Sequence, residues 1–76
     1  MEFEIIFMTI ENLHSEKTGK DYYKVTYLQE KKPVDEFITK EIYEKIRVKN
    51  LKYLGTYTGV FKINPVSRKV ILFDIK

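Results

Sequence analysis

Aromatic rings and cations alternate within residues 19–28, the stretch whose residue types most clearly point to a binding chemistry. Tyr22, Tyr23 and Tyr27 are three of the six tyrosines in the chain, and two lysines stand among them. Aromatic rings offer flat faces on which the bases of a single nucleic-acid strand stack, and ammonium groups neutralise phosphates. The alternative is an ordinary central strand of a small barrel. Both interpretations are open at this point.

The residue types that catalysis and metal binding require are scarce. The chain has no cysteine and one histidine, His14, which excludes disulfides, thiolate chemistry and a histidine-pair metal site. His14 has no nucleophile or orienting partner near it in the sequence, so an exposed loop position is the simpler interpretation. The carboxylates are scattered, and there is no glycine-rich phosphate loop. We therefore expect no enzyme activity, no metal and no cofactor.

Composition predicts one small domain. The chain has 76 residues, of which 43% are hydrophobic and 14% aromatic. That is sufficient for a packed interior and unlike a disordered chain. The acidic start of the chain is unlike a signal peptide, and no apolar run is long enough to span a bilayer. We therefore expect a cytoplasmic protein.

The charge of the chain is divided unevenly between its two parts. Residues 1–44 hold six lysines and ten carboxylates, a net charge of −4, whereas residues 45–76 hold eight basic residues and one carboxylate, a net charge of +7. Such asymmetry indicates a surface that faces a polyanion. The alternative is a solvated face that keeps a small protein soluble.

Alternating apolar residues and turn signals predict five strands and one helix. The expected strands cover residues 2–13, 21–29, 34–38, 53–63 and 70–75. The helix is expected over residues 39–47, with Thr39 as its N-cap and Ile42 and Ile46 on its apolar stripe. Asn50 is the expected left-handed residue that ends it.

Three details of the strands bear on the fold. The apolar face of the first strand switches after Phe7, from the face of Phe3 to that of Ile10, which predicts a bend or bulge. Gly55 and Gly59 in the expected fourth strand indicate a sharp bend or the close approach of a neighbour. In the last strand, the residues expected to face the core are Ile71, Phe73 and Ile75.

Three strands, a short helix and two more strands is the element order of the OB-fold. We therefore predict a mainly β protein: a five-stranded OB-fold Greek-key barrel with one short helix between strands 3 and 4, in a single domain over residues 1–76. The main competitor is an SH3-like barrel, which has no helix of this length at this point. A ferredoxin-like fold would need a second helix.

In the order and spacing of its elements, the whole chain resembles the small single-stranded DNA-binding OB-fold proteins of phages, plasmids and conjugative elements. The residues that carry the likeness are Gly19–Val25, Glu36–Tyr43 and Val70–Ile75. The resemblance implies ligand contact across strands two and three and by the loops at 14–20 and 64–69, in DNA replication or transfer of a mobile element. Larger members end in an acidic tail that recruits partners, and recruitment by that route is not expected here.

The alternation of side chains along the second strand indicates which of them face a ligand and which face the core. If Val25 faces the core, Tyr22 is an outward stacking platform and Lys24 its neighbouring phosphate contact. The other two tyrosines of this strand then point to the core. Phe37 on the third strand fits either role. The remaining candidate phosphate contacts are Lys17, Lys20, Lys62, Arg68 and Lys69.

The expected partner is single-stranded DNA, with RNA as an open alternative and no membrane or metal involved. A homodimer formed through a strand edge also remains open. The competing function is a protein-interaction adaptor on an OB or SH3-like barrel, in which the exposed tyrosines are the contacts. Reading of double-stranded DNA is disfavoured because the one helix is short and needs its apolar stripe for docking.

Overall fold

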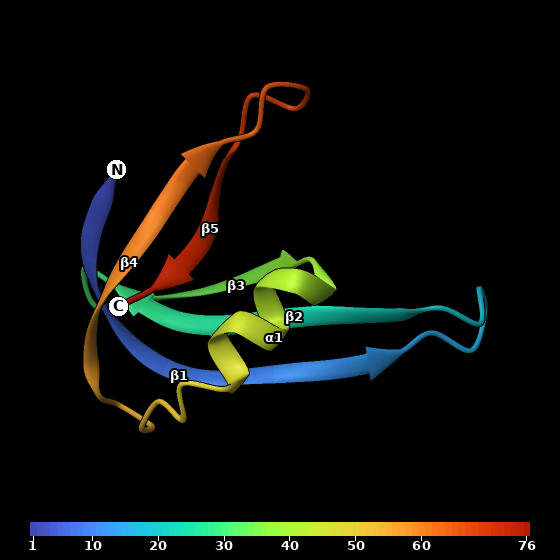
Figure 1. Ribbon diagram of the computed structural model, residues 1–76, viewed down its shortest axis with the longest axis horizontal. Helices are drawn as coiled ribbons and strands as arrows, with labels where there is room; N and C mark the ends of the chain where they lie inside the picture. Colours follow the sequence, from blue (N-terminus) through green and yellow to red (C-terminus); the bar gives the residue numbers. More distant parts are fainter.

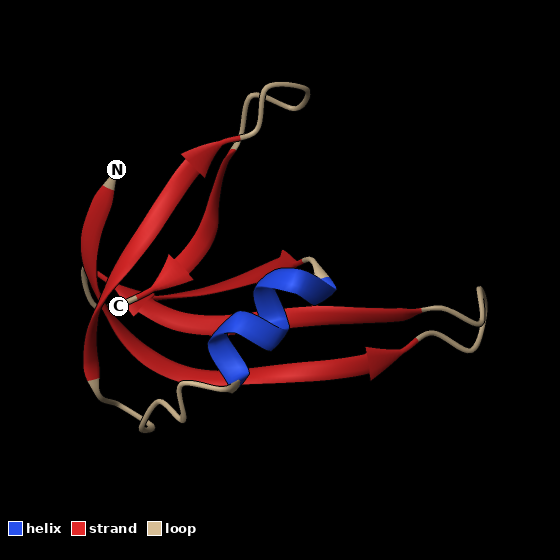
Figure 2. Ribbon diagram, viewed as in Figure 1, coloured by secondary structure: helices blue, strands red, loops and turns tan.

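Five antiparallel strands form one sheet, and a single short helix packs against it (Figures 1 and 2). The computed structural model describes all residues, 1–76. The elements are β1 (Glu2–His14), β2 (Asp21–Gln29), β3 (Lys32–Ile38), α1 (Lys40–Arg47), β4 (Thr56–Ile63) and β5 (Val70–Ile75). The predicted order of elements, with the helix between the third and fourth strands, is confirmed. The helix is too short to cross a bilayer.

The long strand β1 holds the sheet together because each of its halves pairs with a different neighbour. The strand order is β3-β2-β1-β4-β5, and Ile6 of β1 pairs with both Leu28 of β2 and Thr56 of β4. Figure 1 shows the result: β1, β2 and β3 form one limb, and the β4–β5 hairpin forms a second limb that diverges from it. The sheet is not closed into a barrel, so the predicted closure is not observed.

A side-chain carboxylate connects β3 and β5, the two edge strands whose backbone hydrogen bonds would close the sheet into a barrel. The carboxylate of Glu36, on β3, accepts a hydrogen bond from the backbone N–H of Leu72, on β5, and another from the Tyr27 hydroxyl at 3.3 Å. Because this carboxylate occupies the Leu72 N–H, that group is not free to pair with a carbonyl of β3. The two edge strands are thus linked by a side chain.

The predicted irregularity in β1 is confirmed as a β-bulge at Met8. The pairing with β2 shifts register between Phe7 and Thr9. The extra residue reverses the alternation, so Ile10 packs against the same core as Ile5 and Phe7. The buried core consists of Ile5, Phe7, Val25, Tyr27, Ile42, Ile46, Phe61, Leu72 and Ile75.

A second bulge lies in β5, and it makes the core-facing residues of that strand differ from those predicted. The pairing of β4 with β5 shifts register between Val60 and Phe61, which leaves Phe73 as the extra residue. Leu72 and Ile75, both completely buried, therefore share the core face. The prediction of Ile71 as a core residue was wrong, because strict alternation does not hold across a bulge. Of the predicted set, Ile75 is completely buried and Phe73 is half-buried and packs against the core.

The start of the fourth strand was also predicted three residues too early. The segment before Thr56 is a turn in which Leu54 has a left-handed φ of 63° and the Gly55 N–H bonds the Lys52 carbonyl at 2.9 Å. Gly59 does lie inside β4, and a Cβ there would approach the Phe61 ring to 2.8 Å. The close approach predicted for that glycine is confirmed.

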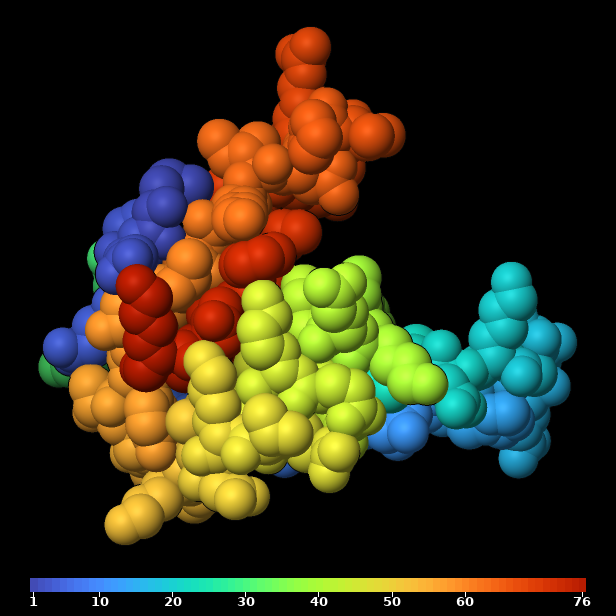
Figure 3. Space-filling model, viewed as in Figure 1, coloured from blue at the N-terminus to red at the C-terminus, as the bar shows by residue number.

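The helix begins and ends at the predicted residues. Thr39 Oγ1 accepts a hydrogen bond from the Ile42 N–H at 3.2 Å, and Asn50 after the helix has a φ of 50°. Ile42 and Ile46 are buried. This apolar stripe docks the short helix on the sheet, which supplies the stability that two turns lack on their own. In the space-filling view α1 lies directly beside β5 (Figure 3).

Candidate nucleic-acid interface

Two aromatic rings lie together on the outer face of β2 and β3. Tyr22 is 40% exposed and Phe37 68% exposed, and their rings meet edge to face with centroids 5.7 Å apart. Val25 on the opposite face is fully buried. Tyr22 therefore points outward as predicted, and Phe37, whose role was open, is also a surface residue.

Lys24 lies beside this aromatic pair because the register places it directly across from Phe37. Its side chain is half-buried. Carboxylates also lie on this face, since Glu11 of β1 pairs with Lys24 and Asp35 accepts a hydrogen bond from Thr26 at 2.7 Å. The face thus combines exposed aromatic area with charges of both signs.

The other two tyrosines of β2 lie on the inner face, as predicted. Tyr27 is only 2% exposed. Burial and the neighbouring Glu36 carboxylate raise the pKa of its hydroxyl well above the ordinary range. Tyr23 is half-buried, and its ring lies 4.8 Å from the ring of Tyr43 on α1. The Tyr27 ring is therefore not available for stacking with a ligand, and the Tyr23 ring already packs against that of Tyr43.

The β1–β2 and β4–β5 loops are closed by the same hydrogen-bond pattern. In the first, the Ser15 N–H bonds the Lys20 carbonyl and the Gly19 N–H bonds the Ser15 carbonyl. In the second, the Asn64 N–H bonds the Lys69 carbonyl and the Arg68 N–H bonds the Asn64 carbonyl. Lys20 and Lys69 are thereby equivalent, and each loop presents a cation at the start of its returning strand.

The residue before that cation differs between the two loops. Gly19 has a φ of 68° and Arg68 a φ of 59°. Glycine adopts this left-handed conformation without cost, whereas another residue is destabilised by about 1 kcal/mol. Arg68 therefore occupies a position that the backbone would fill more favourably with glycine.

None of the six candidate phosphate contacts forms an ion pair. The cations that do pair with carboxylates are His14 (if protonated), Arg47, Lys49 and Lys76. The other Lys and Arg side chains have no carboxylate partner, and the six candidates Lys17, Lys20, Lys24, Lys62, Arg68 and Lys69 are among them. Their charges are therefore free to meet an anionic ligand.

Lys62 lies away from the strand that carries Tyr22, on the second limb of the sheet. Its ammonium group is 3.7 Å from the centroid of the Phe73 ring, and the ammonium group of Lys45 is at the same distance from that ring. Residue spacing does not indicate this arrangement, because it depends on the bulge at Phe73 and on the position of α1 beside β5. Lys45 was therefore missed as a candidate.

His14 has an orienting partner that the sequence analysis did not identify. The hairpin brings its Nδ1 to 2.8 Å from Asp21 Oδ1, and both side chains are exposed. An exposed pair of this kind contributes at most about 1 kcal/mol to stability. Nowhere in the chain do three or more potential metal-ligating side chains gather.

Two carboxylates have pKa values that are shifted in opposite directions. Burial raises the pKa of Glu36, against the lowering effect of the hydrogen bonds from Leu72 and Tyr27. Partial burial also acts to raise the pKa of Asp74, but the hydrogen bonds from Lys49 and the Ile75 N–H outweigh it and hold that pKa below its ordinary value. Glu36 is a structural carboxylate that the sequence analysis did not single out.

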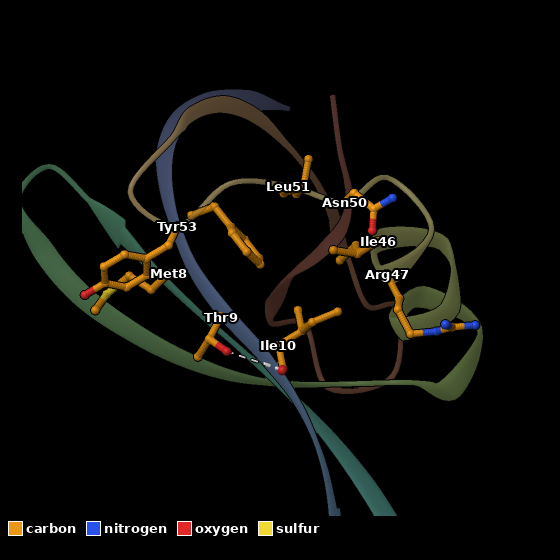
Figure 4. A pocket seen from close by; sticks show the side chains of 9 residues that line it. Met8, Thr9, Ile10, Ile46, Arg47, Asn50, Leu51 and Tyr53 are labelled. Carbon is orange, nitrogen blue, oxygen red and sulfur yellow. Dashed lines mark hydrogen bonds between the residues drawn. The ribbon is translucent and has the colours of Figure 1, made fainter.

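The larger of two surface pockets has a volume of about 290 Å³ and lies between the β1 bulge and the segment after α1 (Figure 4). Its lining is mostly apolar and includes Met8, Leu51 and Tyr53, with Arg47 pointing away at one side. The second pocket, of about 270 Å³, lies near the β2–β3 turn. None of the candidate contact residues lines either pocket.

Comparison of this chain with protein-family models, curated protein sequences and solved structures finds no match.

Proposed function

We propose that this protein binds single-stranded DNA without sequence specificity, on an OB-type sheet whose edges are linked by Glu36 rather than by a backbone ladder. Tyr22 and Phe37 are the surfaces on which bases stack, and Lys24 is the nearest phosphate contact. The order of elements and the central position of β1 support the OB-type assignment. From the resemblance to small phage, plasmid and conjugative-element proteins, we also propose that this binding serves replication or transfer of a mobile element.

The observation that carries the proposal is the exposure of two neighbouring rings on paired strands. Neither ring belongs to the buried core, and Phe37 exposes 68% of its area. Exposure of aromatic area of this kind to water is unfavourable. Such area is suited to stacking with unpaired bases, which contributes about 1–3 kcal/mol per base. Unpaired cations in both hairpin loops would hold the backbone of the strand.

A protein-interaction adaptor is the second candidate function, and a specific observation favours it. Glu11 and Asp35 place negative charge on the face that carries Tyr22, and the β4–β5 hairpin exposes apolar residues that include Ile63 at 60% and Val66 at 91%. Carboxylates repel phosphates, and exposed apolar side chains suit a protein partner.

The salt dependence of binding separates these two functions. In a fluorescence-anisotropy titration with labelled oligo-dT, strand binding is expected at about 50 mM salt and weakens steeply as salt rises, with a slope near −0.7 per phosphate neutralised. Absence of binding at low salt would eliminate the nucleic-acid function and leave the adaptor function. The same titration with oligo-U tests the preference for DNA over RNA.

A further inference from the structure

The second half of β1 has a backbone edge that no other strand covers. Residues Thr9–His14 pair with β2 alone. On the other side of β1, the pairing with β4 ends at Ile6, and the last contacts are two hydrogen bonds between Phe7 and the turn before β4. In Figure 1 the only strand beside this half of β1 is β2. Such an edge presents N–H and C=O groups with which another extended chain can pair.

The hydrogen bonds of the β1–β2 hairpin identify the residues that face this edge. The Ser15 N–H bonds the carbonyl of the residue before β2, so Ser15 faces that strand. Hydrogen-bonded positions alternate along an antiparallel pair, and therefore Ile10, Asn12 and His14 direct their backbone groups to the free edge. In agreement with this, the Ile10 carbonyl accepts a hydrogen bond from the neighbouring Thr9 hydroxyl at 3.4 Å (Figure 4).

The larger apolar pocket lies where the free edge begins. Met8 and Ile10 of β1 line one side of it, and Leu51 and Tyr53 of the segment before β4 line the other (Figure 4). With a volume of about 290 Å³ it is smaller than the pockets that enclose whole organic ligands, and it suits one apolar side chain. The Tyr53 ring is 66% exposed, so it is free to contact that side chain.

The segment that joins α1 to β4 carries only positive charge. Its two charged residues are Lys49, which pairs with Asp74, and Lys52, which has no carboxylate partner. Lys52 stands in the sequence between Leu51 and Tyr53, the two residues that this segment contributes to the pocket wall. A carboxylate next to the apolar side chain of a ligand is therefore complementary in charge to this end of the edge.

We propose that the free edge of β1 binds an extended peptide segment of a protein partner by β-strand addition. One apolar side chain of that segment occupies the pocket, and a carboxylate stands next to it. Backbone hydrogen bonds to Ile10, Asn12 and His14 supply affinity, and the pocket supplies specificity. Because Tyr22 and Phe37 lie on the outer face of β2 and β3, this site is independent of the proposed function.

A second copy of this chain fits the site less well than such a peptide. If two β1 edges paired antiparallel about Asn12, the residue opposite Met8 would be Glu16 of the other copy. A charged side chain would then lie beside the apolar pocket. The pocket therefore favours a partner with an apolar side chain at this position.

A display library of random peptides of about ten residues tests the proposal without presuming a sequence. Peptides are selected on the wild-type protein, and the affinity of the synthesised peptides is measured by fluorescence anisotropy. We expect alternating apolar and polar residues, with one large apolar residue next to Asp or Glu. Asn12→Pro removes an N–H from the free edge, where proline is tolerated, and Tyr53→Ser removes part of the pocket wall. Each variant should lower affinity about 10-fold or more.

Val66→Ser is the matched control, because it removes an exposed apolar side chain from the β4–β5 hairpin, away from the edge. It should leave the affinity for the peptides unchanged. A selected peptide with N-methylated backbone amides tests strand addition on the unaltered protein, which keeps the test decisive if Asn12→Pro does not fold. This peptide should lose most of its affinity.

Amide hydrogen exchange followed by nuclear magnetic resonance locates the new hydrogen bonds. Bound peptide should slow exchange at Ile10, Asn12 and His14, whereas Glu11 and Leu13, which already bond to β2, should change little. Selection of no peptide, or equal affinity for wild type, Asn12→Pro and Tyr53→Ser, would overturn the proposal. Slow exchange at the three edge residues in a dimer of the free protein would assign the edge to a second copy and overturn it as well.

Discussion

The rings of Tyr22 and Phe37 meet edge to face, with centroids 5.7 Å apart and an angle of 61° between their planes. They come from two paired strands, and the register that brings them together also places Lys24 directly across from Phe37. Edge-to-face packing fixes each ring against its neighbour while leaving both exposed. A ligand therefore meets a surface that is already ordered, which lowers the entropy lost on binding.

Removal of either ring should weaken binding of oligo-dT without unfolding the protein. We expect Tyr22→Ala and Phe37→Ala each to reduce affinity about 5- to 150-fold, because one stacked base contributes about 1–3 kcal/mol. Both side chains lie outside the buried core, so the thermal midpoint should change little. Fluorescence anisotropy and thermal unfolding measure the two quantities.

Tyr53→Ala is the control for these variants. Tyr53 is 66% exposed and lines the apolar pocket beside the β1 bulge. Its removal should leave affinity for oligo-dT unchanged. Equal losses in the Tyr22 and Tyr53 variants would mean that exposed tyrosines contribute without regard to position, contrary to a defined stacking face.

Arg68 should show a trade-off between stability and binding. Arg68→Gly relieves the left-handed φ of 59°, and we expect the free energy of unfolding to stay level or rise by up to about 1 kcal/mol. Affinity for oligo-dT should fall, since a cation is lost. Arg68→Lys keeps both the charge and the strain, so its stability should match the wild type. Urea unfolding and the oligo-dT titration measure these effects, and a clear loss of stability in Arg68→Gly would contradict the assigned backbone conformation.

The bulge at Phe73 predicts which residues of β5 support the core. Leu72→Ala should lower the free energy of unfolding by about 2–5 kcal/mol, because Leu72 is completely buried. Ile71→Ala is the matched control, and since Ile71 is only half-buried its cost should be distinctly smaller. Urea unfolding measures both, and the reverse order would restore the alternating pattern expected from the sequence.

Local signals in the sequence were sufficient for much of the fold. The capping hydroxyl of Thr39, the switch of apolar face after Phe7 and the left-handed Asn50 act within a few residues of their own position, and each is confirmed. The bulge at Phe73 has no such signal, because it arises where β4 and β5 pair. The carboxylate of Glu36 between β3 and β5 likewise depends on strands far apart in the chain.

The candidate site, like the fold, was predictable only where local alternation decides the direction of a side chain. The outward direction of Tyr22 followed from alternation against Val25, which holds because β2 pairs with β3 without a bulge. Phe37 could be placed only once that register was known. Lys45 and the relation of Lys62 to Phe73 depend on a helix docked beside a bulged strand. Such contacts between distant elements cannot be inferred from the spacing of residues in the sequence.

Glu36→Gln should change how stability depends on pH. Burial raises the pKa of Glu36 in the folded protein, so the folded state binds this proton more tightly than the unfolded chain does. The stability that results is fully present below the unfolded pKa and is lost as pH rises through the folded pKa. We therefore expect the melting temperature of the variant, relative to wild type, to increase as pH rises from below the ordinary pKa of a glutamate carboxyl through the raised pKa of the folded protein.

Glutamine is suitable here because its amide oxygen still accepts the Leu72 N–H. Glu36→Ala is the contrasting variant, since it leaves that N–H without a partner and should cost about 1–3 kcal/mol at every pH. Thermal unfolding across this pH range measures both. If wild type gains stability relative to Glu36→Gln as pH rises, the hydrogen bonds to the carboxylate outweigh its burial, and the stated direction of the pKa shift is wrong.

The stacking of bases on Tyr22 and Phe37 is tested most directly by nuclear magnetic resonance. The ring-proton signals of all aromatic residues are followed while oligo-dT is added at low salt. Stacked bases shield the protons beneath them, so the signals of Tyr22 and Phe37 should shift upfield, whereas those of Tyr27 and Tyr53 should stay in place. Binding of oligo-dT that leaves the Tyr22 and Phe37 signals unmoved would contradict the account.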